Sequence, residues 1–492
     1  MKEDLQNYFR KFRKDIIGID ATYLTPYGEK KVVYCDWIAS GRLYAPIEER
    51  LARVIGPFVA NTHTETSESG SRMTWAYHHA QKIIKEHVNA GPSDVIITAG
   101  PGMTTVVNKL QRLLGLKGCS NYLDGACLRN DDHPVVFLTH MEHHSNQTSW
   151  YETIADVVVL EPDSDMLVDP ENLRQELKKY SNRKYKIGSF TSCSNVTGVV
   201  TPYHELARIM HENGGICLID FAASAPYYEI NMHPVDPMEK LDGIFFSPHK
   251  FLGGPGSSGV LIFDSGLYKN EVPDQPGGGT VDWTNPWGEY KYVDDIEVRE
   301  DGGTPGFMQA IKAALAIEVK NSMGIARMKE REDELLLKTF AGLRAIDGVH
   351  ILADNVTNRL GVVSFYLEHV HYNLVVRLLS DMYGIQVRGG CACAGTYGHF
   401  LLEVSHEKSR SITQKINRGD LSEKPGWVRL SLHPTMTDEE LDLFLYAVKE
   451  ISANARSFEK DYIYTPRANE FTHKNDTGES RKLVKKWFDL EL

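Results

Sequence analysis

The chain has 492 residues, of which 42% are apolar, and 54 basic against 66 acidic residues give it a formal net charge of −12. Its length is too great for one compact core and predicts two or three domains. The acidic balance argues against nucleic acid or an anionic membrane as the main partner. No apolar run reaches the roughly 18 residues of a membrane span, and the N-terminus lacks the apolar core of a signal peptide. We therefore expect a cytoplasmic protein.

Short apolar runs alternate with helical patterns up to residue 263. The runs that predict strands are VIITA (95–99), VVFLT (135–139), VVVLEP (157–162), IGSFTS (187–192), ICLID (216–220), GIFFS (243–247) and GVLIF (259–263). Helical patterns begin near Thr104 and Ser145, and another occupies 204–214. Continuous β-branched runs between helices are typical of a mainly parallel sheet buried on both faces, so the fold class is α/β.

The pattern changes after Pro305, where a second domain is expected to follow. The predicted elements are a long helix over 305–320, a charged helix over 326–344, a strand over 361–367, a helix near 371–382 and a last helix that opens on TDEE (437–440). Thr437 and Glu440 have the spacing of a capping box. We divide the chain into an N-terminal segment that packs with the small domain (1–33), a large domain (34–320), a small C-terminal domain (321–455) and a charged extension (456–492).

The seven cysteines do not indicate a disulfide framework in so long a chain. Cys193 and Cys217 lie in or beside apolar runs and are expected to be inert core residues. Cys119 and Cys127 flank a loop, but no other ligand pair accompanies them, so we predict no metal site.

A lysine follows the strand that ends at residue 247. In SPHKFLGGPGSSGVLIF (247–263), Lys250 has Ser247 and His249 before it and glycines after it. A lysine at a strand end is usually a solvated surface residue, whereas a lysine that forms an imine must be reachable and partly desolvated. Ser247 and His249 are able to donate to a phosphate, and the glycines let the backbone approach a ligand.

Two earlier strand ends carry groups suited to the same ligand. Asp220 is either a helix N-cap or the partner of a protonated pyridine nitrogen, which keeps such a ring electron-withdrawing. The glycine turn at 100–110 leads into a helix, and Gly102, Met103 and Thr104 would form a phosphate cradle there. Ligands of open α/β sheets bind at such strand ends.

The next two strand ends add a ring and an amide. MEHHSN (141–146) offers His143 or His144 to stack on a flat cofactor, although a histidine pair is more often exposed. SNVTG (194–198) offers Asn195 as a donor to a ring oxygen, although asparagine is also common in turns. Each group is ambiguous alone, but together they predict a pyridoxal 5′-phosphate (PLP) site with Lys250 as the imine lysine.

From about Tyr34 (YCDWIASG) to about Ala447 the chain resembles the class V aminotransferase superfamily of fold type I PLP enzymes, and within it the cysteine desulfurase and selenocysteine lyase group. The resemblance implies a seven-stranded sheet domain, a smaller α/β C-terminal domain and a homodimer with active sites at the subunit interface. It assigns Lys250 as the Schiff-base lysine, Asp220 as the pyridine partner, His143 as the stacking histidine, Thr104, Ser247 and His249 as phosphate ligands and Asn195 as the residue near the cofactor hydroxyl.

Two further segments match the family. GGGTV (277–281) resembles the loop that brings a threonine, here Thr280, to the phosphate of the neighbouring subunit. In GWVRLSLHPTMTDEE (426–440), Arg429 matches the arginine that binds the substrate carboxylate, for which a guanidinium is well shaped.

The segment IQVRGGCACAG (385–395) bears on the reaction type. In one desulfurase subgroup an arginine is followed five residues later by the catalytic cysteine, a spacing that Arg388 and Cys393 keep. Flanking glycines would leave the thiol exposed, and Arg388 would favour its thiolate. The resemblance implies that Cys393 attacks the sulfur of PLP-bound cysteine, forming a persulfide and releasing alanine. Cys391 is a candidate relay thiol, and the alternative is that both cysteines are small residues of a tight turn.

Two positions depart from the family pattern. Ala223 stands where glutamine is frequent, and Met103 stands where threonine is usual. The leading hypothesis is a cysteine desulfurase-like enzyme that acts on an amino acid and passes sulfur to an acceptor protein. The alternatives are a PLP-dependent aminotransferase or C–S lyase that does not use Cys393, and a non-catalytic scaffold. The extra length at 117–133 and after 456 carries no chemistry that the sequence reveals.

Overall fold

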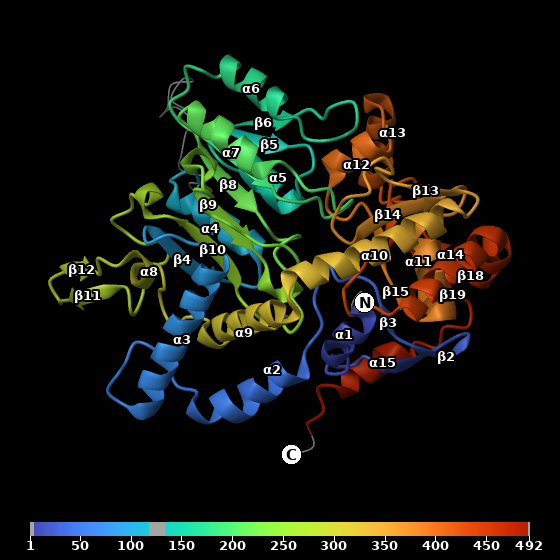
Figure 1. The fold of residues 1–492 in the computed structure, drawn as a ribbon, viewed down its shortest axis with the longest axis horizontal. Coiled ribbons are helices and arrows are strands. Elements are labelled where there is room, and N and C mark those ends of the chain that lie inside the picture. The colour runs from blue at the N-terminus through green and yellow to red at the C-terminus, as the bar shows by residue number, and fades with distance from the viewer. Residues whose placement is uncertain (1–3, 118–132, 491–492) are drawn as a thin grey trace.

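The computed structural model describes residues 4–117 and 133–490. Its larger part, which we call the large domain, is built on a seven-stranded sheet (Figure 1). The strands are β4 (Asp94–Ala99), β5 (Val135–Thr139), β6 (Asp156–Leu160), β7 (Lys186–Thr191), β8 (Ile216–Asp220), β9 (Gly243–Phe246) and β10 (Gly259–Asp264), in the order β4-β10-β9-β8-β7-β5-β6. The five strands β9-β8-β7-β5-β6 pair in parallel, and β10 is antiparallel to both of its neighbours. The predicted mainly parallel sheet is confirmed.

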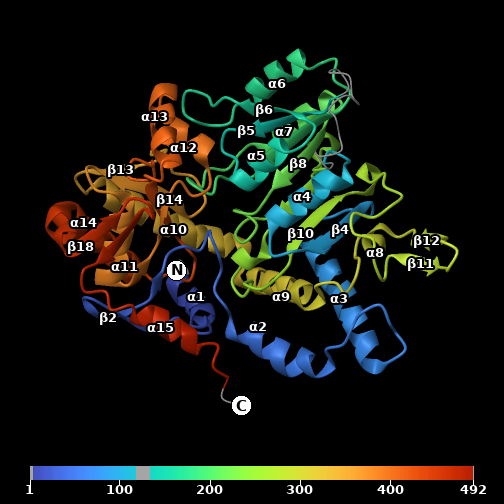
Figure 2. The same ribbon diagram turned by 180° about the vertical axis from the view of Figure 1, so that it is seen from behind.

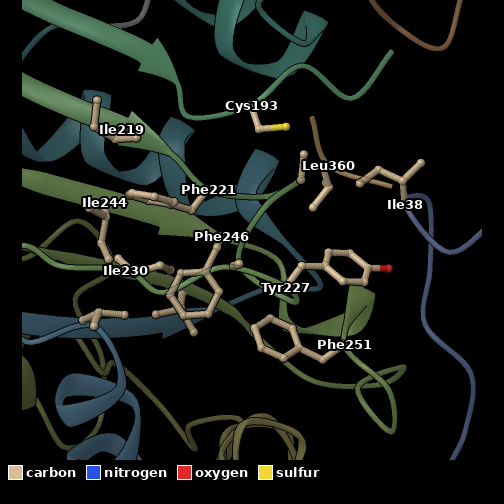
Figure 3. Packing of buried hydrophobic residues seen from close by; sticks show 14 of the residues in the cluster. Ile38, Cys193, Ile219, Phe221, Tyr227, Ile230, Ile244, Phe246, Phe251 and Leu360 are labelled. Atoms are coloured by element: carbon tan, nitrogen blue, oxygen red, sulfur yellow. The ribbon is translucent and has the colours of Figure 1, made fainter. Parts of the chain in front are cut away.

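Helices cover both faces of this sheet. The helices of the large domain are α2 (Ala45–Arg50), α3 (Glu68–His87), α4 (Met103–Leu113), α5 (His144–Tyr151), α6 (Pro170–Lys179), α7 (Tyr203–Glu212), α8 (Ile296–Arg299) and α9 (Phe307–Met323), of which α2 lies away from the sheet (Figure 1). Alternate strand residues point to opposite faces: Val136 packs with α4 in one cluster, and Phe137 packs with α6, α7 and α9 in another. Figure 3 shows part of the second cluster, with Phe246 beside Phe251.

The small domain contains a second, antiparallel sheet. Its strands are β13 (Val349–Ile351), β14 (Val362–Leu367), β16 (Arg388–Gly390) and β17 (Trp427–Ser431), in the order β13-β14-β17-β16. Its helices are α10 (Ile325–Arg344), α11 (Tyr372–Tyr383), α12 (Gly395–Leu401), α13 (His406–Asn417) and α14 (Asp438–Phe458). The capping box at the start of α14 is confirmed, since Thr437 and Glu440 exchange both hydrogen bonds.

Segments from both halves of the chain, near its start and after α14, lie against the small domain (Figure 2). The N-terminal elements are α1 (Leu5–Arg13), β1 (Thr22–Thr25), β2 (Gly28–Lys31) and β3 (Val33–Tyr34), and β3 pairs with β15 (Ile385–Gln386). Arg13 of α1 donates to Glu440 through its two terminal guanidinium nitrogens, Nη1 and Nη2. The C-terminal elements are β18 (Tyr462–Thr465), β19 (Glu470–His473) and α15 (Glu479–Lys486).

The C-terminal extension contributes to the core, although its sequence showed no core pattern. Tyr462 and Phe471 of the β18–β19 hairpin are buried in the small-domain cluster. Each of these short strands buries too few side chains to produce a recognisable period. Among the residues described, no helix has both the length and the apolarity that a membrane crossing requires.

Candidate active site

A cavity of about 230 Å³ opens where the strand ends of the large domain meet the small domain. The predicted residues that line it are Met103, Thr104, His143, Asn195, Asp220, Ser247, His249, Lys250, Arg388, Cys393 and Arg429. Gly102 lines an adjoining hollow that shares Met103, Thr104, Ser247 and His249 with this cavity. Segments far apart in the sequence are therefore brought to one place.

Lys250 ends a short helical turn (Pro248–Lys250) directly after β9. The turn is tight because Gly254 lies against it: a Cβ at Gly254 would stand 1.8 Å from the carbonyl oxygen of Pro248. Burial lowers the pKa of Lys250 to about 8, while Asp220 opposes the shift. A larger share of the amine is therefore unprotonated near neutral pH than for an ordinary lysine.

Asp220 is the last residue of β8 and is almost fully buried. Its Oδ1 accepts a hydrogen bond from the backbone N–H of Ala222 at 2.8 Å. Burial raises the pKa of Asp220 to about 6, with that N–H and Lys250 opposing. A cationic partner placed beside this carboxylate would stabilise its charged form.

The start of α4 and the end of β9 form a polar cradle. The backbone N–H of Met103 donates to Ser247 Oγ at 2.9 Å, and Thr104 Oγ1 lies 2.7 Å from Ser145 Oγ. A Cβ at Gly102 would stand 2.9 Å from Ser247 Oγ, so glycine permits this close approach. Burial is the main cause that lowers the pKa of His249 to about 4, and the positive charge of Lys250 is the second. The ring of His249 is therefore neutral. A helix N-terminus with such donors suits a phosphate.

His143 forms the N-cap of α5, and its Nδ1 accepts a hydrogen bond from the N–H of Ser145 at 3.1 Å. Burial lowers the pKa of His143 to about 3, with Lys250 the next cause, so the ring is neutral. The preceding Glu142 is buried and accepts hydrogen bonds from Thr139 Oγ1 at 2.7 Å and Asn146 Nδ2 at 2.8 Å. Glu142 thereby fixes the segment that carries the ring. We did not predict this role, although the segment MEHHSN (141–146) contains both Glu142 and Asn146.

Asp36 joins the two predicted arginines. Its Oδ1 lies 2.9 Å from Nη2 of Arg429, and its Oδ2 lies 3.0 Å from Nη2 of Arg388. Arg429 is buried and also donates to the backbone oxygen of Asn195 at 3.1 Å, while its Nε has no partner among the described residues. Burial lowers the pKa of Arg429 and Asp36 opposes this shift. The sequence analysis missed Asp36, which lies in the YCDWIASG segment.

Cys393 lies in a β-turn formed by residues 391–394, which the N–H of Ala394 closes by donating to the oxygen of Cys391 at 3.0 Å. The thiol-bearing residue is exposed and lines the cavity. Ala392 and Cys393 have positive φ values of 48° and 56°. The predicted alternative of a tight turn is thus correct in its geometry, and the same turn presents Cys393 to the site.

The other cysteines and Thr280 do not join the predicted group in this way. Cys193 borders the cavity but is buried, and burial raises its pKa, which favours the unreactive thiol. Thr280 lies outside the cavity, and its hydroxyl donates to the oxygen of Gly277 at 2.7 Å. Cys119 and Cys127 fall outside the described residues. Within 4–117 and 133–490, no cluster of three His, Cys, Asp or Glu side chains is arranged to hold a metal ion.

Known proteins are similar to this chain in sequence and in structure. Two relatives named probable cysteine desulfurase match 74% of this chain and 84% of their own: that of Halalkalibacterium halodurans is 29% identical over 371 residues, and that of Staphylococcus epidermidis is 28% identical over 365 residues. The apo structure of a cysteine desulfurase from Thermococcus onnurineus has a TM-score of 0.71 at 24% identity, covering 90% of this chain and 98% of the other. A cysteine desulfurase from Escherichia coli has a TM-score of 0.68 at 21% identity, covering 92% and 98%.

The two solved structures share the fold with this chain. A family model described as aminotransferase class-V matches residues 33–444, which include the whole cavity. The chain belongs to the aminotransferase class-V family.

Proposed function

We propose that this chain is a PLP-dependent, cysteine desulfurase-like enzyme that takes sulfur from cysteine onto Cys393. The observation that carries the proposal is the presence of an accessible thiol, a lysine of lowered pKa and a buried arginine in one cavity. The names of the relatives support the same reaction class.

The residues of the cavity fit PLP. Lys250 would hold the cofactor covalently, Asp220 would face its pyridine nitrogen and His143 would stack on its ring. Ser247, Thr104, His249 and the amides at the start of α4 would bind the phosphate. The buried Oδ1 of Asn195 has no partner among the described residues and would accept from the ring hydroxyl, whereas the amide nitrogen predicted as the donor already donates to the oxygen of Ala392. When bound, PLP supplies an electron sink that stabilises negative charge beside the substrate α-carbon.

The protein's own groups then divide the remaining work. Arg429 would bind the substrate carboxylate, and Asp36 would keep both guanidinium groups in position. Lys250, with a pKa of about 8, is suited to take and return a proton near neutral pH. The Cys393 thiolate would attack the sulfur of the bound cysteine. A sulfur–sulfur bond forms as the Cβ–S bond breaks, the three-carbon product takes up a proton and leaves as alanine, and Cys393 retains a persulfide for an acceptor.

We also propose a homodimer in which the loop that carries Thr280 lies at the phosphate end of the other subunit's site, where Thr280, buried in its own loop here, would have to turn outward. The hollow beside the cavity contains the buried Ser257, whose hydroxyl has no partner among the described residues. The hairpin of β11 (Val281–Thr284) and β12 (Tyr290–Tyr292), which follows Thr280, projects from the large domain (Figure 1) and exposes Trp287. A projecting aromatic hairpin is suited to a protein interface.

Cys393→Ser tests the reaction. Purified protein with PLP and cysteine should yield sulfide and alanine, and the variant should lose at least about 100-fold in rate, because nothing replaces the attacking thiol. Cys391→Ser is the matched control and should retain the rate. Lys250→Ala should lose the visible absorbance of bound cofactor. Sulfide release that is unchanged in Cys393→Ser would overturn sulfur transfer through this thiol.

A further inference from the structure

His144 holds the Cys393 turn to the large domain at two points. Its backbone N–H donates to the oxygen of Cys393 at 2.7 Å, and its ring Nε2 accepts the N–H of Gly395 at 2.9 Å. Because a backbone N–H is always a donor, Nε2 must be unprotonated to make the second bond. Helix α5 follows His143, which lines the cavity. The same helix therefore also binds the segment that carries the thiol.

The backbone of the turn is in an unfavourable conformation that requires support from outside. Ala392 and Cys393 both occupy the left-handed region, at φ 48° and 56°, which is unfavourable for residues with a side chain. Such conformations persist only where surrounding contacts impose them. Asn195 adds a third contact, since its Nδ2 donates to the oxygen of Ala392 at 2.8 Å. Of these contacts, only the ring of His144 titrates.

The surroundings of His144 keep its ring neutral. Burial is the main cause that lowers its pKa from the ordinary value of 6.5, and the positive charge of Lys424 is the second. The other titratable group beside it is the ring of His143, with a centroid separation of 6.4 Å. The accepting form of Nε2 therefore prevails at neutral pH, and acid removes it.

We propose that His144 is a positioning residue whose neutral ring latches the 391–395 segment onto the cofactor site, and whose protonation releases it. The functional meaning of the latch rests on the proposed sulfur transfer to Cys393. The latch itself is measurable without turnover. In the unlatched protein the thiol is no longer fixed over the cavity. The rate of sulfur transfer therefore falls once the pH is below the pKa of the His144 ring.

Hydrogen exchange of the holoenzyme tests the latch. A peptide covering residues 391–397 reports the amides of Ala394 and Gly395, after correction for the intrinsic pH dependence of exchange. In the native protein, protection should fall by about threefold to tenfold on acidification, as expected for the loss of one hydrogen bond. His144→Gln, whose amide oxygen accepts at any pH, should keep its protection. His144→Leu should lack that protection at every pH.

Gln147 provides a matched control from the next turn of α5. Its amide exchanges hydrogen bonds with the Thr396 hydroxyl at 2.8 and 3.0 Å, and it does not titrate. Gln147→Leu should lower protection equally at all pH values and preserve the acid-dependent loss. Sulfide production should follow the same order, with the acid limb of the rate profile displaced in His144→Gln.

Two results would overturn the latch: an acid-dependent loss in His144→Gln equal to that of the native protein, or native protection in His144→Leu. Failure of the proposed function is distinguishable from either result. It would appear as unchanged sulfide release in Cys393→Ser, while the exchange data on His144 would still stand.

Discussion

Glu332 in α10 is a buried carboxyl group that should reduce stability at neutral pH. It is 1% exposed, and neither of its oxygens has a side-chain hydrogen-bond partner in the described chain, where the backbone N–H of Gly361 is the one hydrogen-bonding group that favours its charged form. Burial raises its pKa from 4.5 to about 8, with Lys329 the main opposing charge. The folded protein therefore keeps a proton that the unfolded chain releases. Its contribution to the free energy of unfolding falls as pH rises from about 4.5 to about 8.

Glu332→Gln removes this titration at nearly constant shape. The variant should become more stable than the native protein as the pH rises. From the two pKa values, the difference between their free energies of unfolding should increase by about 3 kcal/mol from about pH 5 to about pH 7.5. Urea unfolding followed by tryptophan fluorescence at both pH values measures the gain. Glu318→Gln, at an exposed position of α9, is the control and should show no such gain. Parallel pH dependences for the native protein and Glu332→Gln would refute the reasoning.

Three further substitutions test the support of the site. Asp36→Ala leaves the buried Arg429 without its counterion and should destabilise the protein by about 3–5 kcal/mol, seen as a lower thermal midpoint; an unchanged midpoint would contradict the pairing. Thr437→Ala removes a helix cap and should cost about 1 kcal/mol, measured by urea unfolding and absent if the cap is not formed in solution. Gly254→Ala places a Cβ 1.8 Å from the oxygen of Pro248, so the lysine turn must shift, and the absorbance of bound cofactor should fall; native absorbance would show that the turn adapts.

The strands and most of the cavity followed from the sequence because both depend on local patterns. Apolar runs such as VVFLT became fully buried strands, and polar residues after such runs met at one edge because parallel strands end together. The antiparallel direction of β10 did not follow, since an apolar run specifies burial and not direction.

The residues that sequence reasoning missed act through distant partners. Asp36 lies 352 residues from Arg388 and 393 from Arg429, and no spacing rule connects positions so far apart. His144 was predicted only as an alternative stacking ring, because its partner Gly395 belongs to the other domain. Such contacts depend on how the two domains pack together, which local sequence patterns do not specify.

The C-terminal hairpin supports the segment that carries Cys393 indirectly, through Tyr372. Asn469 donates to the hydroxyl of Tyr372 at 2.7 Å, and the ring of Tyr372 fills the space beside Gly389 and Gly426, next to the strand that leads into the cysteine turn. The match to the family model ends at residue 444, inside α14 and before this hairpin. A chain shortened to the family match would therefore lose two thirds of α14 and the hairpin that contacts Tyr372 behind the cysteine turn. The family-model match and the packed core of the small domain therefore end at different places in the chain.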